Sequence, residues 1–422
     1  IVTGEQIRDY LDATTRKYGI DGHIEYNTRV ISVDWSSQDK RWTVTAERGG
    51  KQFETTARFV VACTGYYDYE SPYDPGFAGI EDFTGEVAHP QFWPQDLDYS
   101  GKKVVVIGSG ATAVTVVPAM AEKASSVTML QRTPSYVLNA PSEDPIARLF
   151  RKWFSPARAY ALTRRKNVLI SRGIWLLCQK YPNFSRRLIR YFNKKALPEG
   201  YPVDEHFNPP YNPWEQRLCA VPDGDLFKAI SDGCASIVTD HIQTFTPAGV
   251  LLKSGGELQA DIIVTATGLN LQLFGNVQMT VDGAPVDMAR KVAFKGMMLD
   301  GIPNFAFAVG YTNSSWTLKV GLLCEHFCRL LAHMDQHGYR TCVAQLPSTD
   351  MPTRPLLDFG AGYVQRAIHL LPRQGPGAPW LMSMNYLEDV RLMRSGPVAD
   401  INLKFAAVTP RAQPTALAKA PA

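Results

Sequence analysis

Residues 102–113 read Lys-Lys-Val-Val-Val-Ile-Gly-Ser-Gly-Ala-Thr-Ala, the strongest indication of the fold in the chain. Val104 to Ile107 is a short, apolar, β-branched run, which is typical of a strand buried on both faces. A Gly-x-Gly-x-x-Ala turn follows at once, and residues 111–123 then have the composition of a helix. The order strand, glycine turn, helix N-terminus predicts a doubly wound α/β lobe that binds a pyrophosphate group.

Each small residue of the turn has an expected task. Gly108 makes the tight turn, Gly110 lets the backbone approach phosphate, and Ala113 permits close packing of helix on strand. A bare glycine pattern is weak evidence, but this one has the flanks that such a site requires. The candidate binding residues here are Gly108, Ser109, Gly110, Ala111, Thr112 and Ala113.

A second strand, Ser126 to Leu130, ends at Gln131 and Arg132, where the ribose of a dinucleotide would lie. A site for NAD would carry Asp or Glu at this point, whereas Arg132 suits a 2′-phosphate. The sequence therefore predicts an NADP(H) site. The alternative is a glycine turn in another kind of α/β unit, with Arg132 merely solvated.

The chain has 422 residues, enough for two or three domains. Its net charge is +4, but basic and acidic residues are unevenly distributed along the chain. Residues 148–195 contain fourteen Lys and Arg and no acid, so the remaining 30 basic residues face all 40 acidic ones, a net −10. The basic stretch, about 145–197, has helical apolar spacing and reads as a helical insertion. Its charge could attract an anionic membrane surface, or it could be a solvated face; no module for nucleic acid accompanies it.

The seven cysteines are scattered, without a Cys-x-x-Cys pair, which suits a reducing, cytoplasmic compartment and no zinc site. No signal peptide is visible, and Arg172 interrupts the longest apolar stretch, so a transmembrane helix is not expected. Residues 318–333 read as a packed core helix. Cys324 and Cys328 lie one turn apart on it, but His326 points elsewhere, so metal ligation is not expected.

Two parts of the chain resemble each other. A turn and a polar strand lead into Arg58 to Gly65, which ends in Thr-Gly, and a similar pair leads into Asp261 to Gly268, which ends in Thr267-Gly268. This repeat predicts two similar nucleotide-binding lobes whose Thr-Gly ends bring backbone close to a cofactor; two unrelated buried strands are the alternative. Before the first copy, Thr3 can cap a helix over residues 5–17, and strands are expected at His23–Glu25, Val30–Val33 and Trp42–Thr45.

The connection before the central strand reads Phe83-x-Gly85-x-x-x-His89-x-x-x-Trp93-Pro94. Composition alone favours a hinge between lobes over an acid–base site, although His89 could titrate near neutral pH. The segment resembles, at every fixed position, the fingerprint of type I Baeyer–Villiger monooxygenases. Together with residues 211–219, 265–271 and 310–316, it makes the chain look like the ethionamide-activating (EthA-type) branch of that family, over nearly all of residues 1–405.

The resemblance implies an enzyme that uses FAD, NADPH and O₂. In the family a C4a-peroxyflavin attacks a ketone and an ester or lactone results; members also oxygenate sulfur in thioamides or thioethers. Arg217 matches the active-site arginine, and a planar, always-charged donor can stabilise oxyanions. Gln216 stands where many relatives have a Lys for the 2′-phosphate, which leaves more of that task to Arg132. The resemblance implies that His89 acts in the hinge between the lobes and in catalytic cycling.

The same resemblance divides the chain. It implies a first FAD-lobe part at 1–96, an NADP lobe at 97–265 with its insertion at about 141–215, a second FAD-lobe part at 266–405 and a disordered tail at 406–422. Val33 would pass near the adenine, while Gly65, Thr267, Gly268 and Asn313 would approach the flavin. The FAD glycine motif that opens family members is not found after Ile1, so these 422 residues are expected to hold FAD weakly and to purify without yellow colour.

The sequence therefore leaves three candidate functions. The first is a Baeyer–Villiger monooxygenase with a small ketone or sulfur compound and O₂ as substrates. The second is a flavin-containing monooxygenase that oxygenates only sulfur or nitrogen. The third is a truncated product that binds NADP without catalysis. A disulfide reductase is disfavoured, because no redox-active cysteine pair is present.

Overall fold

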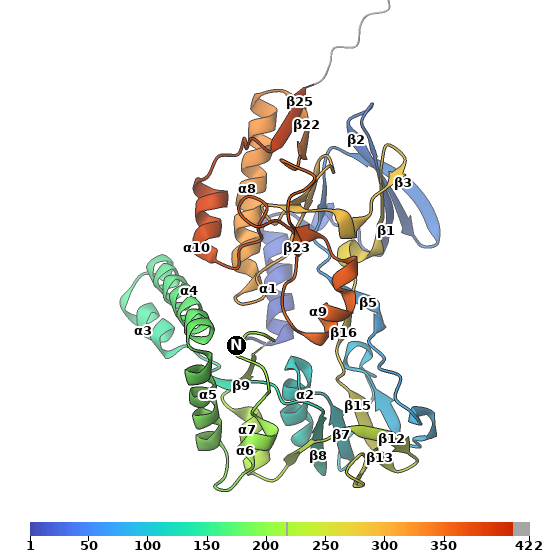
Figure 1. Cartoon of the computed structure of the whole chain (residues 1–422), viewed down its shortest axis with the longest axis vertical. Coiled ribbons are helices and arrows are strands. Elements are labelled where there is room, and N and C mark those ends of the chain that lie inside the picture. The colour runs from blue at the N-terminus through green and yellow to red at the C-terminus, as the bar shows by residue number, and fades with distance from the viewer. Residues whose placement is uncertain (217, 408–422) are drawn as a thin grey trace, which may run out of the picture.

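The computed structural model describes residues 1–216 and 218–407. Figure 1 shows two lobes, one above the other in that view, with a group of basic helices beside them. We call the lower one the parallel-sheet lobe and the upper one the mixed-sheet lobe. The predicted α/β architecture is confirmed.

Five parallel strands form the sheet of the parallel-sheet lobe, in the order β11-β8-β7-β15-β6. They span β6 (Glu86–Ala88), β7 (Lys103–Ile107), β8 (Ser126–Gln131), β11 (Ala235–Thr239) and β15 (Ile262–Thr265). The first strand of the βαβ unit, β7, lies at the centre, and the strand order reverses between β7 and β15. In such sheets ligands bind at this reversal, beyond the carboxyl ends of the strands.

The two faces of this sheet are covered differently. Val104 and Val106 point to a core shared with the helices α2 (Ala111–Ala121) and α7 (Asp225–Ser231). Val105 and Ile107 point to the opposite core, which a three-stranded antiparallel sheet closes. The strands of that sheet are β12 (Ile242–Thr246), β13 (Gly249–Leu252) and β14 (Glu257–Gln259). The apolar run around which the sequence is organised is therefore buried on both faces, as predicted.

The insertion consists of helices that follow β9 (Val137–Ala140) and precede β10 (Cys219–Pro222), which pair in parallel. These helices are α3 (Pro145–Trp153), α4 (Pro156–Lys180), α5 (Pro182–Ala196) and α6 (Val203–His206). Only Ala147 of α3 and only Ala159 and Cys178 of α4 are buried. The two helices therefore bury little of their own surface.

The mixed-sheet lobe has a five-stranded sheet in the order β18-β17-β1-β2-β3. Its strands are β1 (Thr28–Ser36), β2 (Arg41–Arg48), β3 (Lys51–Ala57), β17 (Gln278–Val281) and β18 (Ala284–Pro285). A second, parallel pair lies beside it: β4 (Val60–Ala62) and β21 (Phe305–Phe307). Because their carboxyl ends are neighbours, residues 63–65 and 308–313 leave the pair at the same edge.

The lobe is completed by helices and short strand pairs. The helices are α8 (Trp316–Gln336), α9 (Gly362–Ala367) and α10 (Tyr386–Asp389), while α1 (Gly4–Lys17) has no buried residue. The pairs are β19 (Ala293–Phe294) with β20 (Met298–Leu299), β22 (Tyr339–Ala344) with β25 (Leu403–Ala407), and β23 (Arg354–Pro355) with β24 (Arg373–Gln374). Two further strands, β5 (Tyr67–Pro72) and β16 (Leu269–Leu271), pair antiparallel and connect the two lobes (Figure 1).

The internal repeat predicted from the sequence has a structural counterpart. In one copy β1, β2 and β3 form an antiparallel set that leads into β4, and in the other β12, β13 and β14 lead into β15. Both β4 and β15 are short strands in parallel pairing. The N-terminal helix begins as expected, because Thr3 and Gln6 exchange two side-chain-to-backbone hydrogen bonds of 3.0 and 3.2 Å.

Three expectations about local structure were wrong. Residues 23–25 are not a strand: a 3₁₀ turn spans Asp21–His23 and β1 starts only at Thr28, because its partner β2 ends at Arg48 in the Gly49-Gly50 turn. Ala406 and Ala407, expected in the tail, belong to β25, since the edge of β22 offers them a partner. Residues 86–88, expected in the first FAD-lobe part, pair with β15 in the parallel sheet. The rest of the expected tail, 408–422, lies outside the described residues.

A stability experiment can test the close approach on which the glycine turn rests. The backbone of Gly108 has φ +141, and an added Cβ would press into the carbonyl group of Ala266; at Gly110, φ is −81 and an added Cβ would meet nothing within 4 Å. We expect Gly108→Ala to lower the free energy of unfolding by about 2–4 kcal/mol, because strain and overlap add. Gly110→Ala is the matched control and should change it by less than about 1 kcal/mol. Equal urea midpoints for the two variants would contradict the argument.

Candidate functional site

The predicted pyrophosphate turn lies at the carboxyl edge of the parallel sheet. Gly108 leaves β7 and donates its N–H to the carbonyl of Leu130, 2.9 Å away. Gly110 is the N-cap of α2, where no side chain caps the helix. Gly110, Ala111 and Thr112 are exposed, so the first N–H groups of α2 face open space. Ala113 is fully buried, which is the close helix–strand contact that its small size predicts.

The Ser109 side chain is hydrogen-bonded to the neighbouring loop. Its hydroxyl donates to the carbonyl of Thr133, at 2.8 Å, and lies 3.1 Å from the hydroxyl of Ser135. These bonds hold the glycine turn against the segment that follows β8. Arg132, the first residue beyond β8, is exposed and forms no ion pair within residues 1–216 and 218–407. Its guanidinium group is thus free to meet an anion at the edge where the glycine turn lies.

The strand end at Thr267 and Gly268 reaches the same edge. Gly108 contacts Ala266, and Gly268 has φ +108, a conformation that favours glycine. The Thr267 hydroxyl donates to the carbonyl of Tyr73, at 3.0 Å, in the stretch after β5. The structure therefore brings together the ends of β7 and β15, which are far apart in the sequence.

The way β6 packs in the parallel sheet explains the aromatic fingerprint. An added Cβ at Gly85 would overlap the carbonyl of Asp261 and the ring of Phe83, so only glycine allows β6 to pair closely with β15. Phe83 is 8% exposed and lies in the core beneath that pairing. Trp93 packs on the opposite core of the same sheet. The fingerprint thus fixes β6 to the parallel-sheet lobe.

His89 follows β6 directly and lies near Gly268. Its Nδ1 accepts a hydrogen bond from the N–H of Gln91 at 3.1 Å, while its Nε2 is buried without a partner of hydrogen-bonding geometry. Burial lowers the pKa of His89, and the nearby backbone of Gly268 partly opposes that shift. The imidazole is consequently neutral at neutral pH. Gln91 donates to the carbonyl of Asp68 in β5, at 2.8 Å, which places the fingerprint at the connection between lobes.

The predicted flavin-side residues lie at the edge of the other parallel pair. Gly65, with φ +71, follows β4, and the turn Gly310–Asn313 follows β21. The carboxamide nitrogen of Asn313 donates to the carbonyl of Met384, at 2.9 Å, but its Oδ1 is buried and has no hydrogen-bond partner. Buried polar atoms of this kind call for a ligand or water. Val33 differs from these residues, because its side chain is 2% exposed and packs in the hydrophobic core, leaving only backbone to face a cofactor.

The segment before the predicted active-site arginine is well anchored. Asn212 and Glu215 bond each other through two contacts of 2.7 and 2.9 Å, and the N–H of Gly360 donates to the carbonyl of Glu215 at 2.9 Å. Gln216 is partly buried beside Gly360. Residues 215 and 216 therefore touch the mixed-sheet lobe although they follow the insertion. Arg217 itself lies outside the described residues.

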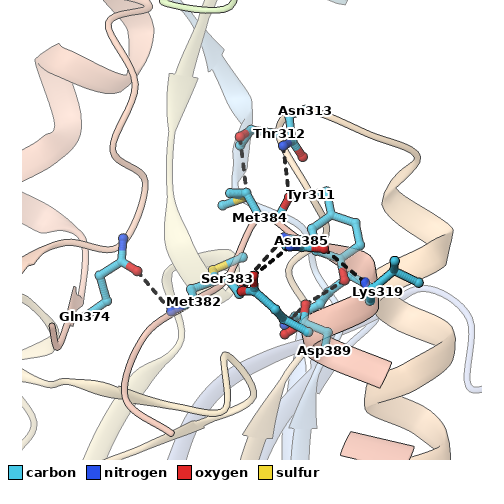
Figure 2. Close-up of polar contacts among 12 residues, drawn as sticks. Tyr311, Thr312, Asn313, Lys319, Gln374, Met382, Ser383, Met384, Asn385 and Asp389 are labelled. Carbon is cyan, nitrogen blue, oxygen red and sulfur yellow. Dashed lines mark hydrogen bonds and ion pairs between the residues drawn. The ribbon is translucent and has the colours of Figure 1, made fainter. Parts of the chain in front are cut away.

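A narrow cavity of about 30 Å³ lies between the insertion and the Asn313 turn. Its walls include Val168 and Trp175 of α4 on one side and Tyr311, Asn313 and Met384 on the other. Tyr311 also contacts two buried charged residues, Lys319 and Asp389, as shown in Figure 2. The sequence reading missed these three residues. A lysine within the apolar stretch 318–333 was the one available signal.

No group of three or more His, Cys, Asp or Glu within the described ranges is placed to hold a metal ion. His326 is 2% exposed, whereas Cys324 and Cys328 are exposed, so they face different surroundings on α8. The described residues thus offer the uncapped start of α2 at one strand edge and, beside the Asn313 turn, a small cavity with one unpartnered acceptor.

Comparison with known proteins agrees with this geometry. A family model described as "Flavin-binding monooxygenase-like" matches residues 1–279. The FAD-containing monooxygenase EthA of Mycobacterium tuberculosis (strain ATCC 25618 / H37Rv) is 51% identical over 407 residues, which cover 96% of this chain and 83% of EthA. The putative FAD-containing monooxygenase MymA of the same strain is 45% identical over 417 residues, with 96% and 83% covered.

A solved structure shows the same fold. Oxidised steroid monooxygenase bound to NADP superposes with a TM-score of 0.73 at 20% identity, over 96% of this chain and 86% of that one. These matches confirm the family resemblance that the fingerprint and the glycine turn indicated. The chain belongs to the flavin-binding monooxygenase-like family, together with the FAD-containing monooxygenase EthA.

Proposed function

We propose that the protein is an FAD-, NADPH- and O₂-dependent monooxygenase of the Baeyer–Villiger type that also oxygenates sulfur in thioamides or thioethers. One observation carries the proposal: two nucleotide edges, one at Gly108–Ala113 and one at Gly65 and Asn313, are joined by the paired strands β5 and β16. The names of the relatives support FAD, and the steroid monooxygenase structure, which contains NADP, supports the second nucleotide.

The described residues fit NADPH and supply one hydrogen-bond acceptor for the flavin. The exposed N-terminus of α2, with no capping side chain, offers N–H groups to a pyrophosphate, and Arg132 offers charge to a 2′-phosphate. The unpartnered Oδ1 of Asn313 can accept a hydrogen bond from the N–H of a flavin. Bound FAD supplies the redox chemistry that takes electrons from NADPH to O₂.

The remaining roles, which are to stabilise charge and to position the lobes, fall to protein residues. We assign to Arg217 the stabilisation of oxyanions, since a guanidinium group is always charged. We assign His89, which lies close to Gly268, to the hinge between the lobes and to catalytic cycling more than to direct proton transfer. An enzyme that oxygenates only sulfur or nitrogen is the competing function, and ketone turnover distinguishes the two.

We also propose that the protein is cytoplasmic and touches an anionic membrane through its basic insertion. No helix of the described chain is long and apolar enough to cross a bilayer. The insertion instead exposes apolar side chains: Ile146, Leu149 and Trp153 on one face of α3, and Leu162, Leu169 and Leu176 at seven-residue spacing on α4. Such amphipathic helices lie in the membrane interface.

The charges of the insertion support the same partner. Arg158, Arg165 and Arg172 each precede one of the three α4 leucines by four residues, so apolar and basic stripes share a face of the helix. Four basic residues of the insertion pair with acids: Arg148, Lys166, Arg190 and Lys194. Within the described residues the three arginines of the stripe form no ion pair; Arg158 and Arg165 are exposed, whereas Arg172 is partly buried and lines the cavity beside Asn313. Unpaired cations beside exposed leucines match anionic headgroups above acyl chains.

Arg132→Ala should reduce the preference for NADPH over NADH. The ratio of kcat/KM for the two nucleotides should fall by about tenfold or more, because a charge-assisted contact to the 2′-phosphate is lost while the pyrophosphate site is intact. Initial-rate kinetics of nucleotide oxidation by the full-length protein measures this ratio. Arg187→Ala, which removes another exposed arginine from α5, is the control and should leave the ratio unchanged. An unchanged ratio for Arg132→Ala would assign the 2′-phosphate to another residue.

Arg217→Ala should abolish oxygenation but not NADPH binding. With phenylacetone and a thioether as substrates, product formation should fall by about 100-fold or more, the loss expected for one oxyanion donor. The Kd for NADPH should stay within about twofold, since the glycine turn and Arg132 are untouched. Product formation at the parent rate would refute the assignment. Sulfoxide without ester from the parent protein would favour the enzyme that oxygenates only sulfur or nitrogen.

Vesicle binding tests the membrane proposal. The full-length protein should co-sediment with vesicles of phosphatidylcholine and phosphatidylglycerol and not with phosphatidylcholine alone, and raised salt should weaken this binding. Arg158→Glu/Arg165→Glu and, separately, Leu169→Ser should reduce it several-fold. Ile401→Ser is the control, because Ile401 is 85% exposed but lies outside the insertion. Equal binding by the charge-reversal variant and its parent would overturn the proposal, as would self-association in place of vesicle binding.

A further inference from the structure

Three ionisable side chains form a buried cluster below the Asn313 turn. Lys319 and Asp389 are both fully buried, and Tyr311 is 2% exposed. The Lys319 Nζ lies 2.7 Å from Asp389 Oδ2, and the Tyr311 hydroxyl donates to the same oxygen at 2.5 Å. Figure 2 shows the two donors converging on this carboxylate. The proposed chemistry uses none of the three groups.

The cluster is a poor source of stability. Burial lowers the pKa of Lys319, against the effect of the Asp389 carboxylate, and burial together with that carboxylate raises the pKa of Tyr311. The second oxygen of Asp389, Oδ1, is buried and has no hydrogen-bond partner. A buried pair that lacks full hydrogen bonding is often no more stable than apolar side chains of the same size. The cluster therefore calls for a reason other than stability.

Its three members come from segments that surround the same turn. Tyr311 belongs to the turn, Lys319 to the first turns of α8, and Asp389 to the end of α10. The turn also lies close against α8, because a Cβ at Gly310 would overlap the ring and backbone of Trp316. Asp389 thus links α10 both to the turn and to α8, the helix that follows the turn.

The segment that leads into α10 holds Asn313 directly. The carbonyl of Met384 accepts a hydrogen bond from the Asn313 carboxamide, and the Thr312 hydroxyl lies 3.7 Å from the sulfur of Met384. Gln374 fixes the start of this segment by accepting the N–H of Met382 at 2.9 Å (Figure 2). With Nδ2 committed to Met384, Oδ1 is the acceptor that Asn313 has left.

We propose that Asp389 is a positioning residue that acts through Tyr311, Lys319 and the 384–389 segment to hold Asn313, so that its free Oδ1 receives a hydrogen bond from bound FAD. The inference rests on the proposed function, in which this turn faces the flavin. It adds the residues that keep the turn in place. None of the three is a catalytic residue, because they reach the cofactor through Asn313.

A double-mutant cycle in the full-length protein tests the inference. Asn313→Ala and Asp389→Asn should each raise the Kd for FAD by about tenfold, the equivalent of one hydrogen bond. The double variant should be no weaker than Asn313→Ala alone, because Asp389 acts through Asn313. Flavin fluorescence gives the Kd, and the flavin absorption band should shift equally in the three variants. Additive losses in the double variant would overturn the inference.

A second variant separates positioning from folding. Tyr311→Phe/Lys319→Met/Asp389→Leu replaces the whole cluster by apolar side chains and should retain the parent's urea midpoint, yet still bind FAD about tenfold more weakly. Arg394→Gln is the control: it removes an exposed ion pair with Glu325, between α8 and the chain just after α10, and should leave FAD binding unchanged. Parent-like FAD affinity in the Phe/Met/Leu variant would overturn the inference. A parent protein that binds no FAD would instead refute the proposed function.

Discussion

The structure depends on one close approach of backbone to backbone, where β7 and β15 end side by side. Gly108 turns away from β7 against the carbonyl of Ala266, in a space that admits no Cβ. This contact lies where the strand order reverses, at the edge beyond which ligands bind in such sheets. The exposed N-terminus of α2 and the Thr267-Gly268 end then face the same edge.

The same constraint explains why the aromatic fingerprint lies where it does. β6 must lie against β15, and the absence of a side chain at Gly85 makes that pairing close. His89 comes next in the chain, and it reaches Gly268 because β6 and β15 run parallel. Gln91 then bonds β5, one of the two strands between the lobes. Motif residues that look catalytic in the sequence are therefore partly explained by packing, and their place at the connection between lobes follows from it.

Charge separates the parts of the molecule. The insertion concentrates fourteen cations without an acid in residues 148–195, and α3 and α4 bury only three residues between them. Such helices are held by few contacts, and their exposed leucines and arginines are available to a partner. The opposite arrangement occurs at Lys319 and Asp389, where a single ion pair is fully buried. There the surroundings exclude water and fix the geometry.

Local patterns in the sequence determined the glycine turn, the helix after Thr3, the helix at α8 and the α/β class, because each depends on residues close together in the chain. The strand expected at 23–25 is wrong for a tertiary reason: β2 ends at Arg48, so β2 offers those residues no backbone to pair with. The meeting of Gly108 with Ala266 and of Lys319 with Asp389 was decided only by the fold, since it joins residues separated by about 158 and 70 positions. Spacing along a chain cannot specify which distant backbones or buried charges will touch, because that depends on how the sheets and helices pack.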